Sequence, residues 1–414
     1  MAGHEAEAVD PRRANLRRRH QCQARYARPC APHGRRRRRR AAHFFGTRRT
    51  PGFVRSHSGD GARADHAQHR SRGRRDKTSR VAAGRGGQTS QYARPGSCSM
   101  KPSPMPSHAN AINFFRDHIT YVIFLAITLY FVLFAPHFAS VSTASAVLRI
   151  TAIVSAMAIG MTFVIICGEI DLSVGSVASF SGMIGALLLG QDVPTYVAAL
   201  LVLAAGAAIG ATSGILVTKI RIPSFLVTLG MLSIFSGLAL TITGTRPVSI
   251  VDDDFSNLFW NGSFLGVQAP IWWTIVLTAV GYYLLHQMPF GRRVYATGGN
   301  PVAARFSGVR TDSVKIFAFV LSGMMASLAG MMLAARSTAG NPSLGAGLEL
   351  DVIAAVIIGG TSLFGGYGSI VGSVVGAIFI GILGFGLLVL GLSTSIQEVI
   401  KGAIIIIAVS LNRR

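Results

Sequence analysis

The sequence predicts an all-α integral membrane protein with about ten transmembrane helices, and two observations support this fold class. Half of the 414 residues are hydrophobic, and charged residues make up only 14% of the chain, against roughly 25% in a typical soluble domain. From about Tyr121 onwards, successive apolar stretches approach the roughly 20 residues that cross a bilayer as a helix. The predicted spans are 120–137, 147–167, 171–190, 195–218, 224–244, 270–288, 313–335, 350–364, 369–390 and 395–411. The eighth is short and glycine-rich, which is compatible with a broken helix.

The basic charge of the chain is concentrated in residues 1–99. This segment holds 25 Lys and Arg against 6 Asp and Glu, whereas residues 100–414 hold 15 against 11. The arginine run Arg35–Arg40 and the lack of apolar periodicity predict disorder. Three interpretations are open: a phosphate-binding arm for RNA or lipid, a targeting peptide, or a segment that is not part of the natural protein.

We favour the third interpretation, in which translation starts at Met100 or Met105. The segment has no interleaved aromatic residues of the kind that stack on single-stranded nucleic acid, and no apolar signal core follows its charges. We therefore expect no nucleic-acid partner. The remaining chain then divides into a cytoplasmic N-terminus at 100–119, a transmembrane domain at 120–411 with a cytoplasmic loop at 289–312, and a cytoplasmic tail at 412–414.

Sequence patterns of catalysis are missing from the chain. Its four cysteines, Cys22, Cys30, Cys98 and Cys167, form neither a disulfide framework nor a zinc motif. The glycine-rich run Gly359–Ser373 lacks the lysine of a nucleotide-binding GxxxxGK[ST] loop. We therefore expect no catalytic residues, no metal site and no cofactor bound by this chain.

Lys and Arg placement predicts the orientation, because cytoplasmic ends of membrane helices carry an excess of these residues. With the N-terminus inside, the outer face holds only Arg149, Arg246, Arg336 and, nearer the lipid, Lys401. An even number of spans also places the C-terminus inside. The basic residues on the cytoplasmic side are Lys101, Arg116, Lys219, Arg221, Arg292, Arg293, Arg305, Arg310, Lys315, Arg413 and Arg414.

The polar stretch Phe290–Asp312 predicts a short helix that docks on a partner. Asn300 can cap the helix, Pro301 suits its first position, and Gly308 suits its end. A helix of about seven residues is not stable alone in water, so it must pack against something. An ordinary basic loop is the alternative.

The composition of this helix suggests which surface meets the partner. Val302 and Phe306, four residues apart, give it one apolar stripe. Ala303 and Ala304 keep part of its surface small, which would permit close approach.

Acidic residues follow the second span in the motif GEIDLSVGS, Gly168 to Ser176. A carboxylate at the centre of a membrane helix costs about 2.5–3.5 kcal/mol on insertion scales, so Glu169 and Asp171 should lie at a helix end or in a polar cavity. They are two residues apart and would point in different directions on one helix, which argues against a paired acid/base site. Asp171 either caps the third span or, with Ser173, lies on a substrate path.

A similar triplet, Glu349-Leu350-Asp351, opens the eighth span. The third and eighth spans correspond if the bundle consists of two five-helix halves. An odd number of helices per half makes the repeats inverted, and such an arrangement places a translocation path between them.

Together, GEIDLSVGS, GGNPVAARFSGV and ELDVIAAVIIGGTSLFGGYGSIVG resemble the membrane permeases of bacterial ABC importers for monosaccharides, the ribose-permease type, within the wider group that includes branched-chain amino acid permeases. The resemblance covers about 112–414. Glu169 departs from it, because the family more often has Gly-Gly-Ile-Asp there. The positions that match the family's structural motifs are Gly168, Glu169, Gly175, Glu349, Asp351, Gly359 and Gly360.

The resemblance implies a subunit of the bacterial inner membrane without catalytic residues. It implies a second permease subunit, cytoplasmic ATPases that bind ATP-Mg, a periplasmic sugar-binding protein and surrounding membrane lipid. The family's coupling helix, which touches the ATPase, matches Asn300, Pro301, Val302, Ala303, Ala304, Arg305, Phe306 and Gly308.

A neutral sugar needs a path lined by hydroxyls, amides and aromatic rings. Candidates near the outer mouth are Asn257, Trp260, Asn261, Trp272 and Trp273; the two tryptophans of the sixth span also suit a membrane interface. The nearest rival is a branched-chain amino acid permease of the same architecture. An ion-coupled secondary transporter is a further alternative, although spans four to seven hold no acidic residue or His except His286, which is at one end.

Overall fold

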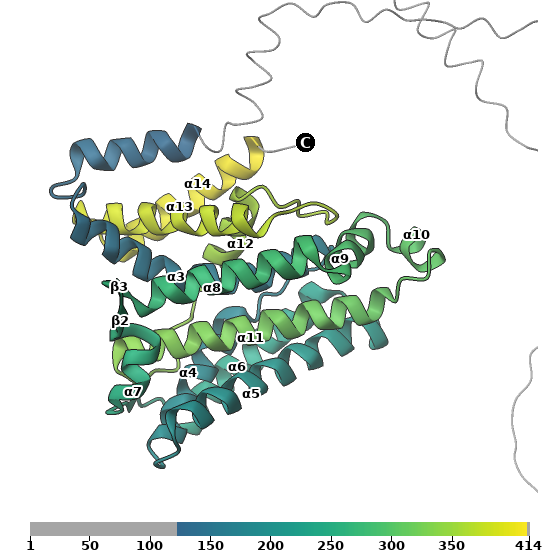
Figure 1. Cartoon of the computed structure of the whole chain (residues 1–414), viewed down its shortest axis with the longest axis horizontal. Coiled ribbons are helices and arrows are strands. Elements are labelled where there is room, and N and C mark those ends of the chain that lie inside the picture. The colour runs from purple at the N-terminus through teal and green to yellow at the C-terminus, as the bar shows by residue number, and fades with distance from the viewer. Residues whose placement is uncertain (1–121, 412–414) are drawn as a thin grey trace, which may run out of the picture. The chain divides into compact units, whose positions relative to one another are not determined.

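The computed structural model describes residues 122–411 of the chain, so the predictions for residues 1–121 and 412–414 lie outside the described residues. The described part is mainly helical (Figure 1). Four two-residue strands form two antiparallel pairs, β1 with β4 and β2 with β3.

The helices that correspond to the predicted spans are Val122–Phe134, α3 (Val141–Ile166), α4 (Val174–Leu189), α5 (Thr195–Ile215) with its extension η1 (Leu216–Ile220), α6 (Ser224–Ile242), α8 (Ala269–Tyr282) with η3 (Tyr283–Gln287), α11 (Thr311–Ser337), α12 (Leu348–Ile358), α13 (Ile370–Val389) and α14 (Thr394–Leu411).

The remaining elements lie between these helices. The loop between α6 and α8, which the sequence predicts on the outer side, contains β1 (Val248–Ser249), α7 (Asp253–Ser256), η2 (Asn257–Asn261), β2 (Ser263–Phe264) and β3 (Val267–Gln268). The predicted cytoplasmic loop contains α9 (Pro289–Gly299) and α10 (Pro301–Phe306). Strand β4 (Ala339–Gly340) follows α11 and pairs with β1, which ties the outer loop to the end of α11.

Each predicted span corresponds to a helix, but not every helix is long enough to cross a bilayer. Five helices of the described chain have the length and apolarity for a full crossing: α3, α5 with η1, α6, α11 and α13. Helices α4 and α12 have 16 and 11 residues, which correspond to about 24 and 16 Å at roughly 1.5 Å per residue. The hydrocarbon core is roughly 30 Å thick, so both are partial spans.

The predicted end of the eighth span at residue 364 is wrong. Helix α12 stops at Ile358, and Gly360 has a φ of +89°, in the left-handed region that ends helices. A methyl group added at Gly359 would overlap the backbone of Gly372 in α13. The chain therefore leaves the helix early and forms a loop over residues 359–369.

The two long helices α3 and α11 are exchanged between the halves of the bundle. Helix α11, from the second half, packs on α4 and α5 of the first half. Helix α3, from the first half, packs on α12 and α13 of the second half, and α3 and α11 also contact each other. Figure 1 shows α4, α5 and α6 on one side of α11, and α12, α13 and α14 on the other side of the bundle.

This contact pattern supports the predicted repeat. If each span of the first half is matched with the span five places later, α3 corresponds to α11, α4 to α12 and α5 to α13. The α11–α5 contact then corresponds to the α3–α13 contact, and the α11–α4 contact to the α3–α12 contact. The α4–α6 and α12–α14 contacts are related in the same way.

Small residues let these helices approach each other closely. A methyl group at Gly210 of α5 would overlap the carbonyl oxygen of Phe319 in α11, and one at Gly206 would lie 2.5 Å from the carbonyl oxygen of Gly323. Helices α5 and α11 therefore pack closely at these two glycines.

Candidate functional site

The predicted cytoplasmic loop contains the short helix that the sequence predicts. The Asn300 carboxamide oxygen accepts hydrogen bonds from the amides of Val302 (3.1 Å) and Ala303 (3.0 Å), and Pro301 occupies the first turn. Gly308 follows the helix with a φ of +83°. The capping pattern is confirmed, and the helix α10 has six residues.

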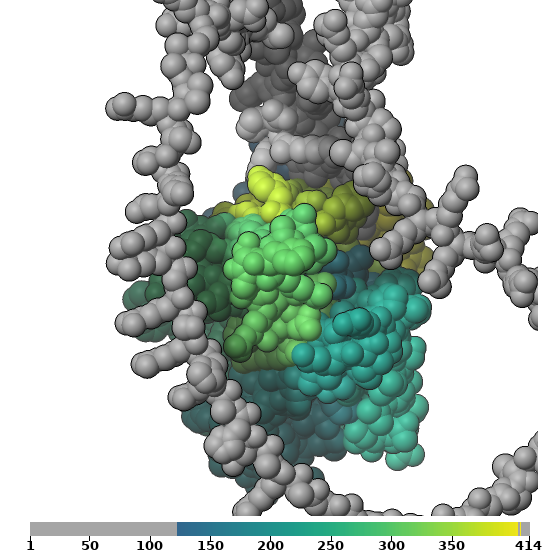
Figure 2. Space-filling view, turned by 90° about the vertical axis from the view of Figure 1, so that its right-hand side faces the viewer, coloured from purple at the N-terminus to yellow at the C-terminus, as the bar shows by residue number. Residues whose placement is uncertain are grey.

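One face of α10 packs against the rest of the chain, and another presents exposed apolar side chains. Phe306 is 89% exposed and Val302 is also exposed, so the predicted stripe has no partner among the described residues. Ala304 is only 5% exposed, so the expectation that it faces a partner is wrong: it packs inwards, because the loop folds back on α11. Figure 2 looks onto this end, where the light-green segment that includes α10 lies beside the yellow-green of the loop after α12.

Arg305 fixes α10 relative to the start of α11. Its Nε donates a hydrogen bond to Thr311 Oγ1 at 2.7 Å, and its Nη2 contacts Asp312 Oδ1 at 3.1 Å. Lys219, at the end of η1, lies 3.8 Å from the other oxygen of Asp312. These exposed pairs are weak individually, but they connect α10 to two long helices.

Three backbone segments meet beside α10 without side chains between them; we call this the glycine junction, formed by Ile166–Gly168, Gly298–Gly299 and Gly365–Gly366. A methyl group at Gly298 would overlap the carbonyl oxygen of Ile166, and one at Gly366 would lie 2.8 Å from the Cα atom of Gly299. The junction joins the ends of α3 and α9 to the loop that follows α12. A displacement of α9 must therefore move both other segments or separate them.

A tyrosine next to the junction strengthens this connection. The Tyr295 hydroxyl on α9 donates a hydrogen bond to the carbonyl oxygen of Gly368 at 2.8 Å. Burial, together with the nearby Tyr367, raises the pKa of Tyr295 above its usual value. The hydroxyl therefore stays protonated and keeps its role as donor at neutral pH.

The two carboxylates of GEIDLSVGS both reach α11. Glu169 forms an ion pair with Lys315, and the two side chains are 15% and 19% exposed. Asp171 is 2% exposed. One of its oxygens accepts hydrogen bonds from the amide and hydroxyl of Ser173 (3.0 and 2.6 Å), and the other accepts from the Ser322 hydroxyl (2.7 Å).

These contacts correct the predicted cap. The N-cap position of α4 is Ser173, whose side chain makes no cap hydrogen bond. Asp171 instead closes a turn before α4 and attaches it to α11. In this structure Asp171 is enclosed by its partners.

The partial spans α4 and α12 start next to each other inside the bundle. A methyl group at Gly175 would overlap the carboxylate of Glu349 and lie 2.5 Å from the carbonyl oxygen of Gly345. The amide of Gly345 donates to the Ser179 hydroxyl at 2.8 Å. The two acidic motifs of the sequence therefore meet where both partial helices begin, as in repeats with broken helices.

The outer-loop candidates divide between two locations. Asn257, Trp272 and Trp273 line a cavity of about 520 Å³. The Trp272 indole donates to the carbonyl oxygen of Phe264 (3.1 Å) and the Trp273 indole to that of Leu258 (3.0 Å), so both polar edges are occupied. Asn261, the last residue of η2, is exposed and does not line this cavity.

Trp260 lies outside that cavity and is mostly buried. The guanidinium carbons of Arg149 and Arg336 lie 4.5 and 5.7 Å from its ring centroid, within cation–π range. Arg149 Nη2 also donates to the Trp260 carbonyl oxygen at 3.1 Å. The ring is therefore engaged by two arginines.

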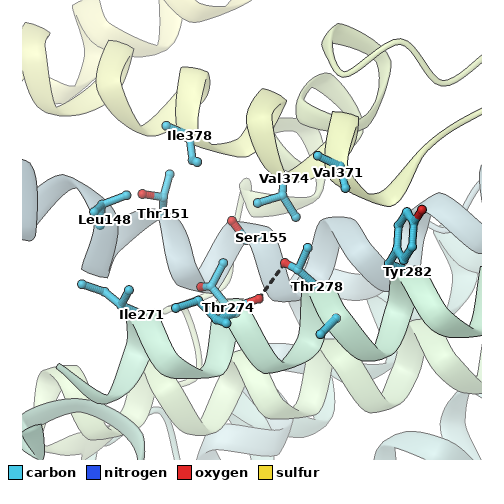
Figure 3. Close-up of a pocket in the computed structure, with 12 residues that line it drawn as sticks. Leu148, Thr151, Ser155, Ile271, Thr274, Thr278, Tyr282, Val371, Val374 and Ile378 are labelled. Atoms are coloured by element: carbon cyan, nitrogen blue, oxygen red, sulfur yellow. Dashed lines mark hydrogen bonds between the residues drawn. The ribbon is translucent and has the colours of Figure 1, made fainter. Parts of the chain in front are cut away.

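A groove of about 470 Å³ between α3, α8 and α13 is the most apolar of the described cavities (Figure 3). Its few hydroxyls come from Thr151, Ser155, Thr274, Thr278 and Tyr282. The threonines use their hydroxyls within their own helices, for example Thr278 to the carbonyl oxygen of Thr274 at 2.6 Å. None of the predicted site residues lines this groove. Within residues 122–411, no cluster of three or more His, Cys, Asp or Glu is suited to hold a metal ion.

Comparison with known proteins decides the family. Residues 143–409 match the family described as "Branched-chain amino acid transport system / permease component". The chain belongs to this family of permeases. It is similar to the ribose import permease protein RbsC of Escherichia coli K12, with 40% identity over 68% of this chain and 88% of the relative.

Two further relatives carry the names of other sugars. The L-arabinose ABC transporter permease protein AraH of Azospirillum brasilense is 36% identical over 70% of this chain and 85% of the relative. The D-allose transport system permease protein AlsC of Escherichia coli K12 is 38% identical over 61% and 78%. No solved structure matches the chain. Family membership and the apolar helices identify the permease as a multi-pass protein of the inner membrane.

Sequence reasoning missed several polar residues that the structure brings together in the permease. Lys401 was expected near the lipid, but its Nζ lies 2.8 Å from Asp351 Oδ2. Gln397 lies one turn earlier on α14, and Arg336 ends α11; both line a cavity with that ion pair. The available signal was that a lysine within an apolar span needs a partner, and that Asp351 is a carboxylate on another span.

Proposed function

We propose that the chain is the transmembrane permease subunit of an ATP-driven ABC importer that moves a monosaccharide across the inner membrane. The observation that carries this proposal is the similarity to importers of ribose, arabinose and allose, with 40% identity over 88% of the ribose permease. Two of the three described cavities have no charged residue in their lining, which supports a neutral cargo.

Helix α10 is the proposed docking element for the ATPase. Its exposed apolar stripe, Val302 and Phe306, would be covered by the partner, and the glycine junction would transmit the movement of α9 and α10 to the segments that adjoin α4 and α12. The ATPase binds ATP-Mg and catalyses hydrolysis, whereas this chain contributes no catalytic residue or cofactor site. ATP-driven closure would then switch the bundle between outward- and inward-facing states.

The remaining partners follow from the same proposal. A second permease subunit, either another copy or a related chain, completes the path, and a periplasmic binding protein delivers the sugar to the outer face. The cavity with Asn257, Trp272 and Trp273 lies on the outer loop, where delivered sugar would first meet this subunit. Both termini are cytoplasmic in this arrangement.

Reconstitution tests the proposal. The permease is purified with its ATPase and binding protein, inserted into liposomes, and supplied with D-ribose, L-arabinose, D-allose or L-leucine. We expect uptake of at least one sugar that requires both ATP and the binding protein. Uptake of leucine alone would establish the branched-chain amino acid alternative. Full sugar uptake without the ATPase, driven by an ion gradient, would establish the secondary-transporter alternative.

A further inference from the structure

A cavity of about 230 Å³ with charged side chains in its wall lies between α3, α11, α12, α13 and α14. Four side chains with strong hydrogen-bonding groups line it: Arg336, Asp351, Gln397 and Lys401. Glycines Gly381 and Gly384 of α13, the Thr151 hydroxyl and apolar side chains of α3, α11, α12 and α13 form the rest of the wall. The wall is mainly apolar, as in the two other cavities described above, but unlike them it includes charged side chains.

The cavity extends inwards from the outer ends of the helices. Arg336 belongs to the last turn of α11, and Gln397 to the first turn of α14. Lys401 is seven residues after Thr394, the first residue of α14, about 10 Å further along the helix at roughly 1.5 Å per residue. Its partner Asp351 is in the first turn of α12, the partial span that begins inside the bundle.

The ion pair between Lys401 and Asp351 lies at the inner end of the cavity, where placing charged groups costs free energy. Charged residues within membrane helices each cost about 2.5–3.5 kcal/mol on insertion scales and mark substrate or ion paths. Lys401 and Asp351 are only 21% and 17% exposed. Their charges cancel, so the cavity is polar at its end without carrying a net charge from this pair.

This chemistry suits an uncharged ligand with several hydroxyl groups. A carboxylate accepts hydrogen bonds, an ammonium and a guanidinium donate them, and the Gln397 carboxamide does both. The Gln397 Nε2 already donates to the Leu392 carbonyl oxygen at 2.9 Å, which orients the carboxamide. The volume of about 230 Å³ has room for a small ligand, and is below the roughly 300–1,000 Å³ of pockets that hold drug-sized molecules.

We propose that the cavity formed by Arg336, Asp351, Gln397 and Lys401 binds the monosaccharide within this subunit during transport. The proposal rests on the proposed function and adds the site and its residues. Asp351 and Lys401 hold the sugar at the inner end of the cavity, and Arg336 and Gln397 contact it nearer the outer surface.

The pair Glu169–Lys315 provides a matched control. It is also a carboxylate–lysine pair with similarly buried side chains, but neither residue lines this cavity. Two double variants are compared in the full importer: Asp351→Leu with Lys401→Met, and Glu169→Met with Lys315→Met. Each removes both charges together, so no unpaired charge remains in the bundle.

We expect the Asp351/Lys401 variant to lose at least tenfold in sugar uptake while it keeps ATP hydrolysis stimulated by the binding protein. The Glu169/Lys315 variant should lose less than threefold in uptake. Uptake within twofold of the parent in the Asp351/Lys401 variant would overturn the proposal. Equal losses in both variants would also overturn it, because they would reduce the pair to a structural role.

A labelling measurement on a variant that keeps the ion pair tests the same site independently of folding defects. Gln397→Cys is introduced into a chain whose four native cysteines are replaced by alanine, and a membrane-impermeant methanethiosulfonate reagent is applied to the assembled importer. The transported sugar should slow modification at least threefold. Modification of Val251→Cys, at an outer-loop position that is 91% exposed, should not change.

The outcomes separate this proposal from the proposed function. Normal uptake of a sugar that leaves the Gln397→Cys modification rate unchanged would overturn the site and leave the proposed function standing. If leucine is the only compound transported, and the only one that slows modification of Gln397→Cys, the proposed function is overturned. The assignment of a sugar to this cavity is then overturned with it.

Discussion

The amide of Gly366 donates a hydrogen bond to the carbonyl oxygen of Ile166 at 2.9 Å. This bond joins the loop after α12 to the last residue of α3, and Gly298, at the end of α9, packs against both. The segment that leads into α10 therefore touches, through backbone alone, the two segments that adjoin the partial spans α4 and α12.

The first prediction concerns coupling through this junction. Gly298→Ala should abolish binding-protein-stimulated ATP hydrolysis, because the added methyl group overlaps the Ile166 carbonyl oxygen and forces the segments apart. Overpacking of this kind costs about 1–3 kcal/mol, so the variant should still insert. Gly299→Ala is the control, since a methyl group there meets no atom within 4 Å. Equal stimulation in both variants would contradict a transmitting role.

The second prediction concerns the docking face of α10. Phe306→Asp should remove the ATPase from the purified complex, because it puts a charge on the exposed apolar stripe. Affinity purification of the permease, followed by measurement of bound ATPase, checks this. Val251→Asp, equally exposed on the outer loop, should retain the ATPase. A substitution at Ala304 is less informative, because that side chain is buried within the chain itself.

Membrane orientation is the subject of the third prediction. In a chain whose native cysteines are replaced by alanine, Phe306→Cys should react with an impermeant thiol reagent only in inside-out vesicles, and Val251→Cys only in right-side-out vesicles. Both side chains are exposed, so each site is reachable from its own side. Reaction of Phe306→Cys from the outer side would contradict the cytoplasmic position of α10.

A fourth prediction concerns the buried pair Glu169–Lys315. Lys315→Met should lower the unfolding free energy, by less than the roughly 3–5 kcal/mol of a fully buried pair, because it leaves a partly buried carboxylate without its partner. Adding Glu169→Met should restore most of that loss. Thermal unfolding of the purified protein in detergent measures both. A double variant as unstable as Lys315→Met would show that the Glu169 charge is not the cause.

The fifth prediction concerns the contact between α5 and α11. Gly210→Ala should lower the thermal unfolding temperature, because the methyl group overlaps the backbone of Phe319. Gly230→Ala on α6 is the matched change, since its added methyl group meets nothing within 4 Å, and it should leave the unfolding temperature nearly unchanged. Similar behaviour of the two variants would argue against tight packing at this crossing.

Local features of this fold were predictable from sequence, and long-range pairings were not. The cap at Asn300 depends on residues within three positions, and the positions of the spans depend on runs of apolar residues; both were predicted and both are present. The pairing of Asp351 with Lys401 joins residues 50 positions apart. Hydropathy shows that Lys401 is in an apolar stretch but not which helix lies next to it.

The candidate site shows the same division. The sequence predicts an aromatic outer mouth, and the structure places Asn257, Trp272 and Trp273 around one cavity. It places Trp260 against Arg149 instead, a contact between an outer-loop residue and a span more than 100 positions earlier. The enclosure of Asp171 depends on Ser322, which no local pattern connects to it.

The exchange of α3 and α11 has a consequence for biogenesis. Helices α4 and α5 pack on α11, which is complete only at residue 337. A chain released from the ribosome after the sixth span would contain the first five-helix half without the helix that fills its centre. Its glycine-lined surfaces would stay open to lipid or to quality-control proteases, so maturation must wait until most of the protein has been synthesised.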